Sequence, residues 1–194
     1  MQQEIIPLFS KCIYVDFLSL NLQPFLKLFE NEPMRCIKEK NDSYQSWSQS
    51  SKDIFVLERN ELNILKKSIM NIFNNYAKNI LKYEYNDFKM TTSWLTKTKY
   101  KQTSTIHRHR NSMFSGVLYL KTEPKKAKIM LHNFSNETSF KLKISKSNIY
   151  NSDTYTFNMS ENVIMFFPSE VYHEIVPSEQ KTERISLAFN FCPI

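Results

Sequence analysis

The spacing of hydrophobic positions changes part-way along the chain, near residue 87. In residues 16–30 and 59–84, apolar side chains recur every three or four positions, which is the period of an amphipathic helix. The intervening residues 35–56 are polar and rich in serine, and we expect a loop there. The first 86 residues therefore predict a helical layer.

From residue 87 onward, short runs rich in Thr, Ile, Val, Phe and Tyr alternate with polar breaks. Many short strands without intervening helices are typical of an antiparallel sandwich or jelly roll. We expect strands at 88–97, 102–109, 113–121, 127–133, 138–144, 153–158, 162–167, 170–176 and 182–191. The predicted fold is mainly β, with residues 1–86 supporting a jelly-roll core over 87–194, all in a single domain.

Composition adds limits on location and partners. The 194 residues are 41% hydrophobic, and the three cysteines, Cys12, Cys36 and Cys192, form no close pair, which favours a reducing compartment. We find no signal-peptide pattern and no apolar run of about 18 residues, so we expect a soluble cytoplasmic protein without a membrane partner. The net charge of +7 fits nucleic acid or simply a lysine-rich surface. Because no arginine-rich, aromatic-interleaved block is present, we favour the lysine-rich surface.

Three of the four histidines are spaced as a metal site would require. His107 and His109 are two apart on a predicted strand, so their side chains point to the same face. His173 follows 64 residues later on another predicted strand. Non-haem iron oxygenases use three protein ligands on one face of the metal and leave positions open for other molecules. His132 has no such spacing, and we interpret it as a sheet-face residue.

An arginine follows at a suggestive distance. Arg184 lies 11 residues after His173 and begins a predicted strand in which Arg184, Ser186, Ala188 and Asn190 share one face. The guanidinium fork matches a carboxylate through two parallel hydrogen bonds, and Ser186 can donate another. A dicarboxylic co-substrate could therefore contact iron with its 2-oxo acid end and Arg184 with its far carboxylate.

Several sequence blocks carry a resemblance to a known superfamily. They are residues 107–120 (HRHRNSMFSGVLYL), 167–177 (FPSEVYHEIVP) and 183–190 (ERISLAFN), with weaker matches at 93–95 (SWL) and 6–9 (IPLF). Over most of residues 90–191 the chain resembles the 2-oxoglutarate/Fe(II)-dependent dioxygenase superfamily. It is most similar to an oxygenase family common in marine phages and bacteria.

The resemblance implies a double-stranded β-helix with iron at the positions of His107 and His173. It also implies 2-oxoglutarate held by Arg184 and Ser186. The reaction it implies couples decarboxylation of 2-oxoglutarate to hydroxylation of a second substrate, with release of succinate and carbon dioxide. The superfamily usually has Asp or Glu where this chain has His109, so His109 is either the third ligand or a supporting group; we favour the ligand.

Other positions and functions stay open from sequence. Strand alternation does not require Tyr119 to face the pocket, so we do not assign it to 2-oxoglutarate. Trp94 is either a core aromatic or part of the substrate mouth, and Asn190 contacts either the co-substrate or a buried backbone group. Two alternative functions are a non-catalytic metal-binding jelly roll and a three-histidine dioxygenase that does not use 2-oxoglutarate. The substrate, small or macromolecular, and the oligomeric state are not predicted.

Overall fold

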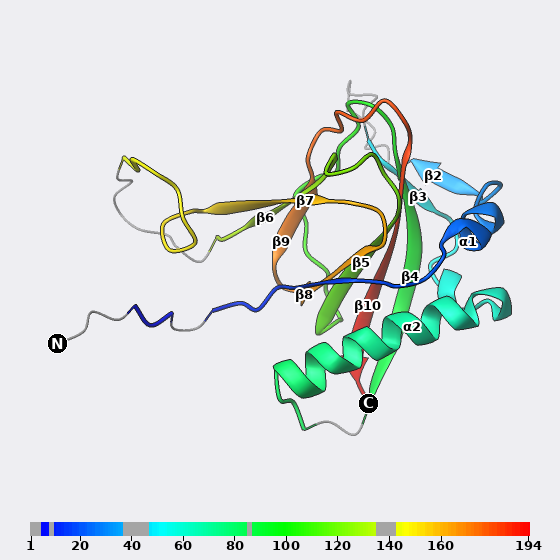
Figure 1. Ribbon diagram of the computed structural model, residues 1–194, viewed down its shortest axis with the longest axis horizontal. Coiled ribbons are helices and arrows are strands. Elements are labelled where there is room, and N and C mark those ends of the chain that lie inside the picture. Colours follow the sequence, from blue (N-terminus) through cyan, green and yellow to red (C-terminus); the bar gives the residue numbers. More distant parts are fainter. Residues whose placement is uncertain (1–4, 8–9, 37–46, 85–86, 135–142) are drawn as a thin grey trace.

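Two antiparallel sheets face one another in the computed structural model, which describes residues 5–7, 10–36, 47–84, 87–134 and 143–194 (Figure 1). The larger sheet has the strand order β1-β8-β5-β10-β4-β3-β2, and the smaller has the order β7-β6-β9. The strands are β1 (Tyr14–Phe17), β2 (Met34–Cys36), β3 (Gln49–Ser51), β4 (Phe88–Thr98), β5 (Phe114–Lys121), β6 (Ala127–His132), β7 (Thr154–Met159), β8 (Val163–Pro168), β9 (Tyr172–Ile175) and β10 (Arg184–Pro193). The predicted mainly β class is confirmed.

The helices lie on the outer face of the larger sheet (Figure 1). They are α1 (Gln23–Leu28), α2 (Asn63–Asn74), the short 3₁₀ turns η1 (Val56–Glu58) and η2 (Asn60–Leu62), and a π-helical turn η3 (Asn75–Ile80) that continues α2. No helix in the described part of the chain is long and apolar enough to cross a membrane.

Helix α2 is held by an apolar stripe that fits the sheet. Leu65, Ile69 and Phe73 recur at four-residue spacing and are fully buried. The Phe73 ring stacks on Phe191 of β10, with centroids 3.8 Å apart and planes 3° from parallel. Burial of each such side chain contributes about 1.5–3 kcal/mol. The helix therefore fixes the outer face of the central strands.

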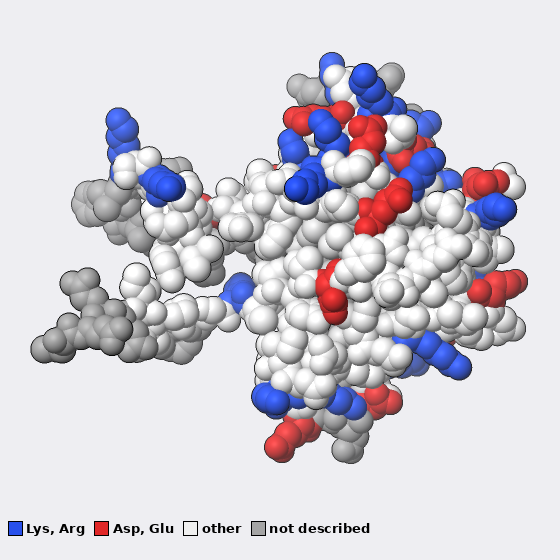
Figure 2. All heavy atoms as spheres, viewed as in Figure 1, with Lys and Arg blue, Asp and Glu red and all other residues white. Residues whose placement is uncertain are grey.

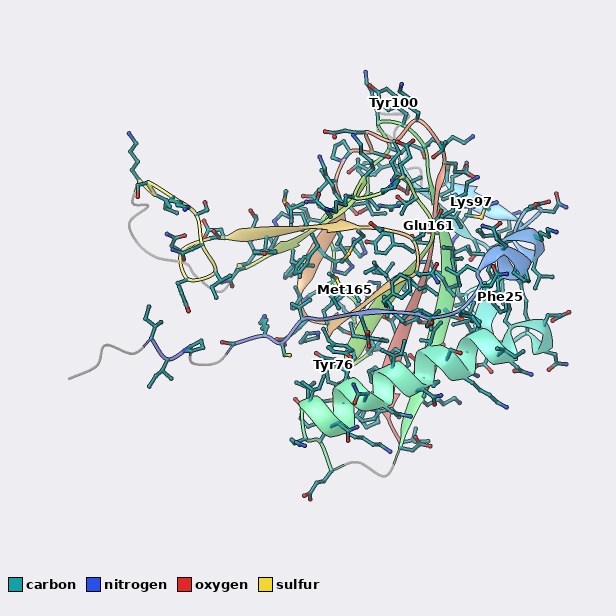
Figure 3. All side chains as sticks on the ribbon, in the orientation of Figure 1. Phe25, Tyr76, Lys97, Tyr100, Glu161 and Met165 are labelled. Carbon is teal, nitrogen blue, oxygen red and sulfur yellow. The ribbon has the colours of Figure 1, made fainter. Side chains whose placement is uncertain are left out.

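Alternation along β10 then sends polar side chains to the other face. Ile185, Leu187, Phe189 and Phe191 belong to the core cluster under α2. The intervening residues of β10 point between the two sheets. A second, smaller apolar cluster fills part of that space and includes Met165, whereas Tyr76 belongs to the cluster on the helix side (Figure 3).

Several elements differ from the sequence predictions. The helix predicted at 16–30 is wrong in its first part, because Asp16 and Phe17 belong to β1, which pairs with β8 at the sheet edge. Only Gln23–Leu28 is helical, with Pro24 in the first turn, where its missing N–H costs nothing. The predicted helix over 59–84 is regular α-helix only in α2.

The loop predicted at 35–56 contains β2 and β3, which extend the larger sheet; residues 37–46 lie outside the described part. The helical layer expected from residues 1–86 thus also supplies three strands. The strand predicted at 138–144 falls mostly on residues outside the described part, and 143–144 are not in a strand. The remaining predicted strands are found within two residues of the expected bounds, except for 102–109.

Candidate metal and co-substrate site

A cavity of about 530 Å³ opens between the two sheets where the smaller apolar cluster ends. Arg184, Ser186, Ala188 and Asn190 all line it, as the alternation along β10 predicts. The three clustered histidines line it as well. Side chains from segments far apart in the sequence therefore meet in one space.

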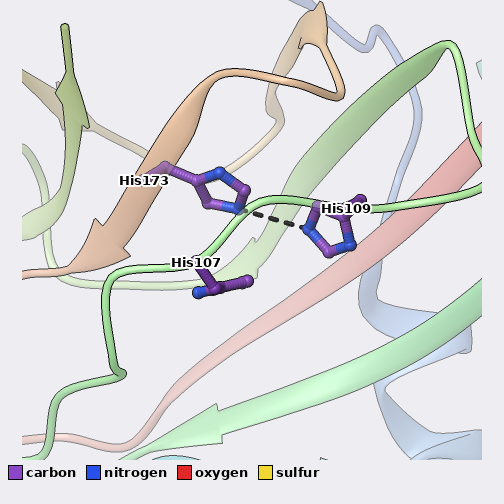
Figure 4. A group of neighbouring side chains, drawn as sticks. All are labelled: His107, His109 and His173. Carbon is purple, nitrogen blue, oxygen red and sulfur yellow. Dashed lines mark hydrogen bonds between the residues drawn. The ribbon is translucent and has the colours of Figure 1, made fainter. Parts of the chain in front are cut away.

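His107, His109 and His173 converge at the side of this cavity (Figure 4). One ligand-capable atom from each lies within 4.8 Å of the others. The Nε2 atoms of His109 and His173 are 3.2 Å apart, and the ring centroids of His107 and His173 are 4.4 Å apart. One small cation can contact nitrogen atoms held this close together.

The strand predicted at 102–109 is wrong, although the two histidines still converge. The segment contains only isolated bridges, including one between His107 and His173. Each of these two residues donates its backbone N–H to the carbonyl oxygen of the other, at 3.0 and 2.8 Å. The His109 backbone N–H donates to the Ser169 carbonyl oxygen at 3.0 Å. Backbone hydrogen bonds to residues in and just before β9 therefore position the segment that carries His107 and His109, although this segment is not a regular strand.

Backbone carbonyl groups select the tautomer of two of the rings. His107 Nδ1 lies 2.8 Å from the Thr105 carbonyl oxygen, and His173 Nδ1 lies 2.9 Å from that of Val171. A carbonyl oxygen only accepts, so both Nδ1 atoms carry the hydrogen. The lone pair of each neutral ring is then on Nε2, which is the arrangement a metal-ligating histidine uses.

The surroundings keep the rings of His109 and His173 neutral. Burial, reinforced by the nearby His107, lowers the pKa of His173 to about 3 and that of His109 to about 4. Neutral imidazoles are good ligands for iron and other first-row metals. The donor set therefore fits a divalent iron ion, and the group of three contains no carboxylate among the described residues.

The neighbouring acid does not join this group. Glu174 Oε1 is 3.0 Å from Nε2 of His132, which pairs with Tyr172 on the adjoining strand. Since alternate residues of β9 face opposite ways, Glu174 lies on the far side of the sheet from His173. His132 is accordingly not in the metal-capable group.

Arg184 also lines the cavity, and only 2% of its surface is exposed to solvent. Its Nη2 donates to Thr98 Oγ1 at 3.0 Å, but its Nε has no partner, and no carboxylate in the described residues pairs with it. Burial lowers the pKa of Arg184. A buried guanidinium without a counter-ion is unfavourable, and a bound carboxylate would relieve that cost.

Polar side chains surround Arg184 on adjacent strands. Ser186 is opposite Thr96 on β4 and opposite Tyr119 on β5, and all three line the cavity. The Arg184 guanidinium lies 5.9 Å from the Tyr119 ring centroid. The residues present thus fit an oxygen-rich, dicarboxylic molecule.

Tyr119 is the residue that sequence reasoning missed. The sequence leaves its face open. An even separation of ten positions from His109 agrees with the face it has, but the strand between them is interrupted, so alternation alone does not establish it. Burial raises the pKa of the Tyr119 hydroxyl to about 12, so it remains a hydrogen-bond donor at neutral pH. The pairing of Ser186 with Tyr119 in the sheet is the signal that locates it.

A series of hydrogen-bonded polar side chains begins at Asn190 and Thr92, which line the cavity. Asn190 donates through Nδ2 to Thr92 Oγ1 at 2.9 Å and accepts from Ser115 Oγ at 2.8 Å. Ser115 Oγ lies 2.7 Å from Ser169 Oγ, which also accepts from Ser112 Oγ at 3.0 Å. Asn190 therefore binds side chains of neighbouring strands. From sequence alone, it is expected to contact either the co-substrate or a buried backbone group. Trp94 lines the cavity, with its ring centroid 5.3 Å from that of His109.

With this geometry in place, comparison with known proteins is informative. The protein family described as "Putative 2OG-Fe(II) oxygenase" matches residues 92–190, which are 99 of the 194 residues. The chain belongs to this family. The matched residues include the three histidines, Arg184 and Ser186. This oxygenase is therefore classed with oxidoreductases, and no curated protein matches its sequence.

Solved structures with the same fold are distant in sequence. A prolyl-4-hydroxylase of Pseudomonas putida is 16% identical, with a TM-score of 0.61 over 95% of this chain and 94% of that one. A viral collagen prolyl hydroxylase from Paramecium Bursaria Chlorella virus-1, solved with 2OG, is 12% identical, with a TM-score of 0.58 over 94% and 96%. HygX from Streptomyces hygroscopicus, with nickel, 2-oxoglutarate and hygromycin B bound, is 8% identical, with a TM-score of 0.61 over 93% and 82%. The oxygenase shares their jelly-roll fold.

Proposed function

We propose that this oxygenase is an Fe(II)- and 2-oxoglutarate-dependent dioxygenase that hydroxylates a second substrate and releases succinate and carbon dioxide. In this proposal His107, His109 and His173 hold the iron. Arg184 and Ser186 hold the far carboxylate of 2-oxoglutarate. The observation that carries the proposal is a buried arginine, without an acidic partner among the described residues, lining the same cavity as three clustered imidazoles.

Arg184 is suited to this task because its neighbours complete the carboxylate contacts. Its unpartnered Nε can donate to one oxygen, while Ser186 and Tyr119 offer hydroxyl groups from paired positions. Hydrogen bonds that involve a charged group contribute about 1.5–3 kcal/mol each. Thr98 accepts a hydrogen bond from Nη2 and so fixes the plane of the guanidinium group.

The iron supplies the oxidative chemistry when bound, and the chain supplies orientation and a protected site. Thr105 and Val171 carbonyl groups hold the outer nitrogens of His107 and His173 and keep the inner ones free of protons. The Trp94 ring contacts that of His109, with centroids 5.3 Å apart, and so limits where this imidazole can turn.

The third ligand is the least ordinary part of the proposal. A neutral imidazole at position 109 leaves one more positive charge on the metal than the usual carboxylate would. The 3.2 Å separation between the Nε2 atoms of His109 and His173 supports two ligands to one ion. No carboxylate of the described residues is placed to substitute for His109.

The test is an anaerobic titration of the protein with Fe(II) and 2-oxoglutarate. We expect a weak visible charge-transfer band, and succinate formation once air is admitted. The variant Ser186→Ala removes only one hydroxyl group from the proposed carboxylate contacts. It should weaken 2-oxoglutarate binding without removing the iron. Absence of both the band and succinate would contradict the proposal.

The three-histidine group also favours a second candidate, a dioxygenase that acts on its substrate without 2-oxoglutarate. Turnover that is independent of 2-oxoglutarate would support that reading. Metal binding without either activity would instead indicate a metal-binding jelly roll. Arg184, which has no acidic partner among the described residues, weighs against both, because each leaves its buried charge without a counter-ion.

A further inference from the structure

A row of polar side chains crosses the larger sheet from the proposed co-substrate site to its edge. Ser186 on β10 pairs with Thr96 on β4, Thr96 pairs with Ser50 on β3, and Ser50 pairs with Arg35 on β2. Directly paired residues face the same side of a sheet, and all four line the cavity. The row therefore ends at Arg35, on the edge strand.

Arg35 has no role in the proposed 2-oxoglutarate site. It lies three strand spacings, about 14 Å at the backbone, from Ser186. In the proposed function one carboxylate of 2-oxoglutarate is held by Arg184 and Ser186 and the other end is at the histidines, so neither carboxylate is left for Arg35. Arg35 is therefore available to a second molecule.

The charge of the cavity wall is one-sided. Of the described residues that line the cavity, two are arginines and none is Asp or Glu. Arg35 is exposed and makes no ion pair with any residue that the structure describes. By contrast, the molecular face in Figure 2 intersperses Lys and Arg with acidic side chains. A cavity lined by one sign of charge concentrates ions of the opposite sign.

Flat aromatic surface lies between Arg35 and the histidines. The chain has two tryptophans, Trp47 and Trp94, and both line the cavity. Trp94 is next to His109, whereas Trp47 lies two residues before the start of β3. The Trp47 Nε1 is buried and has no hydrogen-bond partner among the residues that the structure describes. An indole N–H in that state is a donor available to an acceptor atom of a ligand.

We propose that the substrate is a small molecule with a carboxylate or phosphate group on a flat apolar body. Arg35 binds its anionic group, Trp47 Nε1 donates to an acceptor atom, and Trp94 supports the flat part beside the histidines. This inference rests on the proposed function for its reaction, but the anion subsite itself needs neither iron nor 2-oxoglutarate. A cavity of about 530 Å³ is in the range of small-molecule sites.

Intrinsic fluorescence tests the subsite directly, because both fluorescent indoles line the cavity. The full chain is titrated with phenyl phosphate, benzoate and the neutral benzyl alcohol. The first two differ in their anionic group and identify which one the subsite prefers. We expect quenching by at least one anion and little by the alcohol, with a dissociation constant that rises when salt is added.

Matched variants then identify the arginine. Arg35→Ala should raise the dissociation constant of the preferred anion about tenfold, since one charge-assisted contact is lost. Arg35→Lys keeps the charge and should retain most of the affinity. Lys52→Ala removes an exposed cation that does not line the cavity, and it should leave the constant unchanged.

The Arg184→Met variant separates this proposal from the proposed function. Anion binding that persists in Arg184→Met, and is lost in Arg35→Ala, supports the subsite whatever the result with 2-oxoglutarate. Equal quenching by benzyl alcohol and both anions, or unchanged affinity in Arg35→Ala, overturns it. Anion binding that disappears in Arg184→Met also overturns it, because the probe then occupies the co-substrate position.

Discussion

His109 and His173 are 64 positions apart in sequence, and their Nε2 atoms are 3.2 Å apart in the folded chain. Two neutral imidazoles have no reason to hold their nitrogen atoms together unless a proton or a cation lies between them. Burial lowers the pKa of both groups, so both rings are neutral, and His109 Nε2–H can donate to the lone pair on His173 Nε2. A metal ion would take the place of that hydrogen, and His107 supplies a third nitrogen within 4.8 Å.

Replacement of His109, the proposed third ligand, is the first prediction. We expect His109→Ala to weaken Fe(II) binding by more than the about 10–100-fold that loss of a supporting residue costs, measured by anaerobic titration of the charge-transfer band with 2-oxoglutarate present. His109→Asp restores the carboxylate that the superfamily usually has, and it should recover binding. If the alanine variant binds iron no more than about 100-fold more weakly than the unmodified protein, His109 is a supporting group and not a ligand.

Acid should destabilise the metal-free protein through the histidines. The pKa of His173 is lowered to about 3 and that of His109 to about 4, from 6.5 in the unfolded chain. The unfolded state therefore binds more protons below pH 6.5, so stability present above that pH is lost as pH falls toward 4 and then 3. The slope per histidine is at most about 1.4 kcal/mol per pH unit.

Denaturant unfolding between pH 7 and pH 4 measures this slope. His173→Gln should make it shallower, since it removes the group with the lowest pKa. An equally steep slope in His173→Gln would mean that carboxylates, and not the clustered histidines, govern acid sensitivity.

Replacement of Arg184 should separate stability from function. Arg184→Met removes a buried, unpaired charge, so we expect the ligand-free protein to melt at the same temperature or higher. Addition of 2-oxoglutarate and Fe(II) should raise the Tm of the unmodified protein but not that of Arg184→Met. A marked drop in the Tm of ligand-free Arg184→Met would show that the arginine is chiefly structural.

The single glycine has a packing role that calorimetry can measure. A Cβ at Gly116 would lie 2.8 Å from Phe166 Cδ1 and 2.9 Å from the Met165 carbonyl oxygen, and it would also meet the Phe189 ring. Backbone cannot yield as a flexible side chain does, so Gly116→Ala should cost about 1–3 kcal/mol of unfolding free energy. Val117→Ala, on the next residue of β5, supplies a matched variant that adds no atoms. Equal stability of Gly116→Ala and the unmodified protein would refute the crowding.

The site shows how far period-two alternation reaches. Along β10 the sequence alone predicts that Arg184, Ser186, Ala188 and Asn190 share a face, because each strand residue turns its side chain by half a turn. That inference holds only within an unbroken strand. Tyr119 is ten positions after His109 and faces the same cavity, but the strand between them is interrupted, so the pairing of β5 with β10, and not alternation, establishes its face.

The N-terminal region shows the corresponding limit for helices. Residues 16–30 have apolar spacing that suits a helix, but pairing of Tyr14–Phe17 with Phe166–Val163 overrides that local preference. Similarly, the polar region around residue 50 reads as a loop, although β3 pairs with both β2 and β4. Strand pairing depends on a partner far away in sequence, which local patterns do not encode.

The sequence by itself determined the mainly β class, the choice of three histidines and the face of β10 that carries Arg184, because residue type and local period encode these. Only the tertiary structure decided that carbonyl groups of Thr105 and Val171 orient the rings of His107 and His173, and that Arg184 is buried without an acid among the described residues. It also decided that Arg35 and Trp47 reach the same cavity. These are contacts between distant segments, and they exist only once the two sheets have closed over one another.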